Sequence, residues 1–167
     1  VDVRVDSKGL LFVLSRSNAA NKDVRVSVQT LDSEYMYEFG RWGTDPGQTT
    51  QPTAIALDND DRVYVTDRRN QRIQALNPAN GALIGQLGLG GGTYDHPDGL
   101  DPDRLFLPAG LAYDAQQDAL VVADGFNMVA RAWANPFCPT VASSTSSVSC
   151  GAPATARPAT RRTLSSS

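Results

Sequence analysis

The chain repeats one order of short apolar runs and turn residues, and this repetition restricts its fold more than any other feature. Aspartate-, asparagine- and glycine-rich segments separate the runs, a spacing that is typical of β-strands joined by turns. The pair Asn80-Gly81 predicts a hairpin turn because both residues tolerate positive φ. In the segment 52–88, four runs rich in β-branched and aliphatic side chains lie at 54–57, 62–66, 72–76 and 83–87.

The same order recurs on both sides of this segment. Residues 1–40 hold four comparable runs, and residues 108–134 hold three before the composition changes. Repeated four-stranded units are typical of β-propeller blades. The sequence therefore predicts an all-β, β-propeller-type fold of tandem four-stranded antiparallel blades that is incomplete. Two whole blades are expected at 1–40 and 52–88, and a partial one at 108–134.

Three blades are fewer than a closed propeller needs, since closed propellers have four to eight. The chain also starts at Val1 rather than at methionine, so we expect a fragment or a processed form. Further blades or other subunits are expected to close the propeller, because an end blade exposes an apolar face unless a neighbour covers it. Four residues expected to be at risk of this exposure are Leu11, Val13, Leu120 and Val122.

The composition divides the chain into a body at 1–134 and a tail at 135–167. The tail holds 13 serine or threonine residues and four prolines but few large apolar residues. Such a segment buries too little surface to offset the entropy of ordering it, so we expect a flexible, disordered C-terminal tail. Serine, threonine and proline together are also typical of O-glycosylated stalks, which stays an alternative to an unmodified end.

Two cysteines at the edge of the tail bear on the cellular compartment of the protein. Cys138 and Cys150 form a disulfide candidate, and two free thiols in a cytoplasmic chain are the alternative. We expect an extracellular protein or one of the secretory pathway, and otherwise a cytoplasmic one. No window approaches the length of apolar chain that a transmembrane helix needs, so membrane insertion is not expected.

Polar residues at the end of one strand and the start of the next predict a structural turn in the second blade. Asp67 directly follows the run 62–66, and Arg72 begins the next run, so the two side chains can meet across the turn. Asn70 is expected to adopt the left-handed conformation there. A structural clamp is favoured over a ligand contact because the element belongs to the repeat rather than to one blade.

Propeller topology places certain loops on one face of the molecule, which we call the loop face. It comprises residues 15–23, 41–51, 68–71, 89–107 and 125–127, and binding sites concentrate on such loops. The connector 89–107 is longer than a typical loop, and long loops are often functional or disordered. The residues predicted to bind a partner are Arg68, Arg69, Asn70, Gln71, Asp95, His96, Asp98 and Asn127.

The segment from Pro52 to Gly88 resembles an NHL repeat, the short propeller blade that opens with a Pro-x-x-Ile-Ala-x-Asp motif. The residues that carry the resemblance are Pro52, Ile55, Ala56, Asp58, Val63-Tyr64-Val65, Asp67, Asn70, Arg72-Ile73-Gln74 and Leu87-Gly88. The match is weaker over 1–40, which lacks the Asn-x-Arg-Ile element, and over 108–134, which keeps Asp124 and Asn127 without the arginine.

The resemblance implies two alternatives to a pure binding module. NHL-type propellers resemble the lyase domain that cleaves peptidyl-hydroxyglycine, but that class needs several metal-binding histidines and His96 is the only histidine here. Some NHL faces bind RNA, which needs a basic surface, whereas the body carries a net charge of −6.

The leading hypothesis is a non-catalytic propeller scaffold that binds a protein or glycan partner through its loop face. It is expected to be part of a larger protein or assembly. No catalytic residue and no metal site are expected, since a catalytic metal takes about three protein ligands and one histidine does not supply them. The aspartates of the connector leave calcium as the one open possibility for a bound cofactor.

Overall fold

The computed structural model describes residues 2–17, 22–88, 104–125, 129–135 and 137, and these residues form eleven β-strands. Every strand pair is antiparallel, and the described residues contain no helix. The first sheet contains β1 (Asp2–Val5), β2 (Leu11–Arg16), β3 (Val24–Gln29) and β4 (Tyr35–Phe39). The second contains β5 (Pro52–Leu57), β6 (Val63–Asp67), β7 (Arg72–Leu76) and β8 (Leu83–Leu87). The third contains β9 (Pro108–Asp114), β10 (Ala119–Asp124) and β11 (Val129–Ala134).

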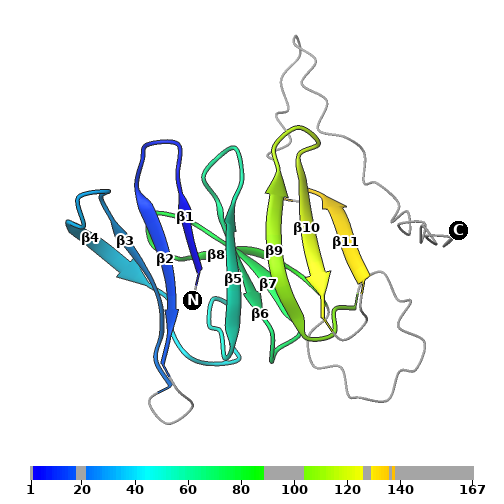
Figure 1. Cartoon of the computed structure of the whole chain (residues 1–167). Helices are drawn as coiled ribbons and strands as arrows, with labels where there is room; N and C mark the ends of the chain where they lie inside the picture. The colour runs from blue at the N-terminus through cyan, green and yellow to red at the C-terminus, as the bar shows by residue number, and fades with distance from the viewer. Residues whose placement is uncertain (1, 18–21, 89–103, 126–128, 136, 138–167) are drawn as a thin grey trace, which may run out of the picture.

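The sheets confirm the predicted fold class of tandem antiparallel blades, two with four strands and one with three described strands. Within each sheet the strands lie in chain order, and the sheets stand side by side from the first to the third (Figure 1). β5 lies between β1 and β9, so the first strand of each blade borders the first strand of the next. The predicted tail lies outside the described residues, apart from Asn135 and Phe137.

One aspartate per blade organises the turn between the first two strands. The Asp58 carboxylate accepts hydrogen bonds from the backbone N–H groups of Asp60 and Arg62, both at 2.9 Å. Asp6 and Asp114 accept equivalent backbone hydrogen bonds in the first and third blades. A short carboxylate that satisfies N–H groups two to four residues ahead fixes a tight turn. This repeated role explains why every unit of the sequence carries an aspartate at that position.

Two apolar clusters hold the three sheets together. Between the first and second blades, the inward side chains of β2 and β3 pack on Ile55, Val63 and Val65. Between the second and third blades, small residues of β5 and β7 receive large residues of β9 and β10, including Leu111, Leu120 and Val122. The second blade is therefore covered on both faces, and its strands β6 and β7 are buried throughout.

The expected exposure of Leu120 and Val122 is wrong. Both side chains are fully buried against the second blade. Residues at these positions face the preceding blade, and for the third blade that neighbour is present. Leu11 and Val13 face the same way on the first blade and remain partly exposed, because no described blade precedes it.

Candidate functional site

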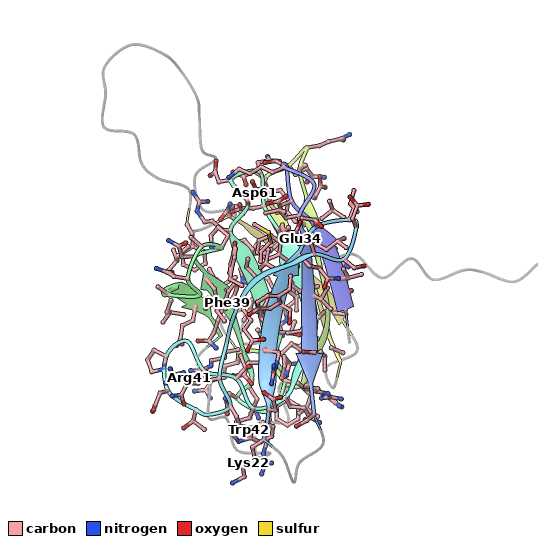
Figure 2. All side chains as sticks on the ribbon, turned by 90° about the vertical axis from the view of Figure 1, so that its left-hand side faces the viewer. Lys22, Glu34, Phe39, Arg41, Trp42 and Asp61 are labelled. Carbon is pink, nitrogen blue, oxygen red and sulfur yellow. The ribbon has the colours of Figure 1, made fainter. Side chains whose placement is uncertain are left out.

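The loop face and the opposite end of the blades are separated by the length of the strands. Lys22, Arg41 and Trp42 lie at the end that carries the loop face, whereas Glu34 and Asp61 lie at the other end (Figure 2). That other end, which we call the turn face, consists of the tight turns within the blades. These turns are residues 6–9, 30–34, 58–61, 77–81 and 114–118.

At the loop-face end of the second blade lies the fully buried carboxylate of Asp67. It accepts a hydrogen bond from the backbone N–H of Thr50 at 3.1 Å and one from the Asn70 amide at 2.7 Å. Its charged partner is Nε of Arg72, at 3.2 Å, and the Arg72 side chain is only 8% exposed. Charge-assisted hydrogen bonds in a dry environment are stronger than neutral ones, so this aspartate ties the connector, the turn and β7 together.

Two side chains of β7 extend this clamp to the connector 41–51. The Arg72 guanidinium donates hydrogen bonds to the backbone carbonyls of Asp45 at 3.0 Å and Gln48 at 2.8 Å. The Gln74 amide donates to the Gln48 carbonyl at 2.7 Å and accepts from the backbone N–H of Gly47 at 2.8 Å. The connector is thus held by buried side chains that bind its backbone, which gives the loop face a fixed support.

The turn prediction placed Asp67 beside Arg72, and the structure brings these two side chains together. It differs at Asn70. The left-handed residue of this turn is Gln71, with φ of 55°, while the Asn70 amide donates to Asp67 and to the Gly43 carbonyl. A side chain already committed to two acceptors stabilises the turn through those bonds rather than through backbone conformation.

The third blade repeats the buried aspartate with a displaced arginine. Asp124 is 1% exposed and accepts a hydrogen bond from the backbone N–H of Phe106 at 2.8 Å. Phe106 precedes Pro108 by two residues, as Thr50 precedes Pro52, so both aspartates hold the chain that enters their own blade. The ion pair is formed with Nε of Arg131, at 3.4 Å, and no arginine stands at the start of β11.

The first blade keeps the arginine without the aspartate. Arg25 lies opposite Ser15 in the strand pairing, as Arg72 lies opposite Asp67. Its guanidinium pairs with Asp23 and Glu38 instead, and these side chains are about two-fifths exposed. The buried clamp is therefore complete in the second blade, modified in the third and replaced by a surface pair in the first.

The predicted partner-binding residues differ in their exposure and in their contacts within the second blade. Arg69 is exposed and Arg68 half-buried, and the buried Nε of Arg68 has no hydrogen-bond partner among the described residues. Asn70 is engaged in the turn, and Gln71 is 9% exposed. The remaining predicted positions lie outside the described residues. These are Asp95, His96, Asp98 and Asn127, together with the disulfide candidates Cys138 and Cys150.

Charges divide unevenly between the two ends of the described blades. The turn face holds eight acidic residues and one lysine. The described part of the loop face holds two acidic residues and six basic ones, and four further aspartates belong to the undescribed stretch 89–103. The basic residues of the described loop face are Arg16, Lys22, Arg41, Arg68, Arg69 and Arg104.

A second buried polar cluster, which sequence reasoning did not identify, lies toward the turn face. The Tyr64 hydroxyl donates to the Asp58 carboxylate at 2.8 Å, and the Asn135 amide donates to the same carboxylate at 3.2 Å. Arg62 completes the cluster by an ion pair with Asp58 at 2.9 Å. Burial, and then the Asp58 charge, raise the pKa of the Tyr64 phenol well above its ordinary value. The cluster joins the second blade to the end of β11 and has a structural role.

Neither metal chemistry nor a membrane span is indicated within the described ranges. No group of three or more histidine, cysteine, aspartate or glutamate residues is arranged there to hold a metal ion. The described part of the chain also contains no helix long and apolar enough to cross a membrane.

Three stacked antiparallel sheets with this strand order define a β-propeller-type protein. Residues 49–76, which include β5, β6 and β7 of the second blade, match the NHL repeat model. No curated protein matches the sequence at a significant level.

The chain is similar to several solved structures at low sequence identity. One is an auxiliary nutrient binding protein from Bacteroides thetaiotaomicron, with a TM-score of 0.51, 16% identity, and coverage of 78% of this chain and 36% of that one. A protein of unknown function from the same organism has a TM-score of 0.52, 14% identity, and coverage of 80% and 46%. Virginiamycin B lyase from Staphylococcus aureus has a TM-score of 0.49, 15% identity, and coverage of 79% and 36%. The chain thus spans less than half of each of these proteins.

Proposed function

We propose that this chain is a non-catalytic propeller module that binds a protein or glycan partner through its loop face. The observation that carries the proposal is the buried clamp, in which Asp67, Arg72 and Gln74 hold the connector 41–51 by its backbone. A rigid support lowers the entropy that a loop loses when a partner binds. We therefore interpret the loop face as a preorganised binding surface rather than as a catalytic centre.

Arg68 and Arg69 are the residues that we expect to anchor the partner. They follow Asp67 directly, so the clamp fixes the turn that displays them, and Arg69 is exposed. A guanidinium presents several donors in a fixed plane and suits carboxylate, sulfate and hydroxyl acceptors of proteins and glycans. Losing one charge-assisted hydrogen bond costs about 1.5–3 kcal/mol, which corresponds to a loss of affinity of ~10- to 100-fold.

The test is binding of the whole chain to two immobilised arrays, one of glycans and one of acidic peptides. Ligands found with the unmodified chain are then measured with Arg68→Ala/Arg69→Ala and with Lys8→Ala, which removes an exposed cation from the turn face. We expect at least a tenfold loss with the double variant and little change with Lys8→Ala. An equal loss in both variants, or no ligand on either array, contradicts the proposal.

A further inference from the structure

Two outer sheet faces of the molecule have no described neighbour, and the first of them is apolar. On the first blade, Val3 lies opposite Val13, and Val5 lies opposite Leu11, so all four side chains share one face. Val3 is 46% exposed and Val5 is 53% exposed. Adjacent exposed aliphatic residues on a sheet are typical of a surface that is covered by another element.

The outer face of the third blade is built from small residues. Val121 lies opposite Ala112 on β9 and opposite Ala132 on β11, and Ala123 lies opposite Gly110 and Ala130. The four alanines of this set are exposed. A sheet surface of alanine and glycine has little relief of its own, so it can receive larger side chains from a neighbouring sheet.

Faces at the same strand positions already meet inside the molecule. In the second blade the aliphatic pairs are Ile55 with Val65 and Leu57 with Val63, and in the third they are Leu111 with Val122 and Tyr113 with Leu120. Both sets of pairs face the preceding blade, where they are covered. The pairs Val3 with Val13 and Val5 with Leu11 occupy the same strand positions in the first blade. The open face of the first blade is therefore the side that normally packs on a preceding blade.

The receiving side is also repeated. In the second blade, Ala56 lies opposite Tyr64, which lies opposite Ala75, and this row packs against the third blade. The row Ala112, Val121 and Ala132 has the same register in the third blade and packs against no described residue of another blade. In strand position, the two open faces therefore correspond to the two sides of the interfaces between blades.

We propose that two copies of this chain associate head to tail and close a ring of six blades. Each copy places Val3, Val5, Leu11 and Val13 against the alanine-rich face of the other, so the internal stacking continues across both junctions. Head-to-tail contacts close when the rotation between units completes a circle. Closed propellers have four to eight blades. Two copies contribute six described blades, and this number falls within the range.

The test is the mass of the whole chain in solution at micromolar concentration, measured by light scattering and sedimentation. We expect twice the 17.8 kDa of one chain. Val5→Lys alters the first face and Ala132→Arg alters the third, and both residues are exposed in a single copy, so both variants retain the blade fold. Each variant alone is expected to halve the mass. Leu31→Lys is the matched control, since Leu31 is 68% exposed but lies in a turn, and it should leave the dimer intact.

Mixing the two variants separates head-to-tail association from other modes. One intact face remains on each variant, so the mixture should form a dimer held by a single junction, although neither variant dimerises alone. A dimer that joins two copies of the first face would lose its mass only with Val5→Lys, which would overturn the proposal. A monomeric unmodified chain, or a dimer insensitive to both variants, would also overturn it. A β-type circular dichroism spectrum verifies that each variant is folded, and Val3→Lys replaces Val5→Lys if it is not.

Discussion

Replacing Asp67 tests whether the buried clamp of the second blade stabilises the fold. Asp67→Ala leaves the Arg72 guanidinium, whose side chain is 8% exposed, without its carboxylate. It also leaves the backbone N–H of Thr50 and the Asn70 amide without an acceptor that they now use. Removing one partner of a buried ion pair costs about 3–5 kcal/mol. Arg72 keeps its hydrogen bonds to the Asp45 and Gln48 carbonyls, so we expect a loss of about 3 kcal/mol in the free energy of unfolding.

The assay is urea unfolding at neutral pH, followed by tryptophan fluorescence. With a slope of about 1–3 kcal/mol per molar urea, the expected loss moves the midpoint down by ~1–3 M. Glu38→Ala is the control, because it removes a carboxylate from the Arg25 pair, whose side chains are both 41% exposed. Exposed pairs contribute about 0–1 kcal/mol, so its midpoint should hardly move.

A double variant decides whether the orphaned charge causes the loss. Arg72→Met removes the guanidinium, and in Asp67→Ala/Arg72→Met no uncompensated charge remains. The double variant should therefore lose less stability than the sum of the two single variants, with a coupling of about 1–3 kcal/mol. Strict additivity, or an effect of Asp67→Ala no larger than that of Glu38→Ala, would refute the reasoning.

Three further results are expected from unfolding measurements. Gly81→Ala should cost more than Gly47→Ala, because both glycines have positive φ, of 70° and 82°, but only the new methyl group at 81 would meet the Phe39 ring, at 2.5 Å. The difference should be about 1–3 kcal/mol, and equal losses would contradict the packing argument. Leu120→Ala should cost about 2–5 kcal/mol because this side chain is fully buried, and a loss below about 1 kcal/mol would place it outside the core. The raised pKa of Tyr64 predicts that stability is present below about pH 10 and is lost as the pH rises above it, since the unfolded chain then releases a proton that the folded chain keeps. Tyr64→Phe should weaken this alkaline loss in urea titrations at several pH values, and an unchanged profile would rule out Tyr64 as its source.

The strands were predictable to within two residues because their signals are local. Runs of β-branched residues and the aspartate and glycine turns between them specify where each strand begins and ends. Asp67 and Arg72 were predictable as neighbours for the same reason, since a turn of four residues joins them. Sequence reasoning favours Asn70 for the left-handed position because asparagine tolerates positive φ. In the structure the Asn70 amide donates hydrogen bonds to Gly43 and Asp67, and Gln71 adopts the left-handed conformation.

Contacts between segments that are distant in the sequence were harder to predict. In the sequence, Gln74 is a polar residue within an apolar strand. The structure shows that its amide forms hydrogen bonds with the backbone of residues 47 and 48. Alternation showed that Leu120 and Leu11 each belong to one face of a strand, but it did not show which face has a neighbour. In the third blade the pairing of Asp124 with Arg131 depends on an arginine displaced by two residues along β11, which no fixed spacing in the sequence reveals.

The hydrogen bonds that hold the backbone of the connector 41–51 affect how this surface can change during evolution. Within the connector, the hydrogen bonds of Arg72 and Gln74 join backbone atoms of residues 45, 47 and 48. The side chains of Thr44, Asp45 and Pro46 are exposed. Substitutions at these three positions therefore leave the gripping atoms in place, while Gly43 and Gly47 preserve the path of the chain. The side chains that this loop presents to a partner can therefore diversify without a matching change in the blade beneath it.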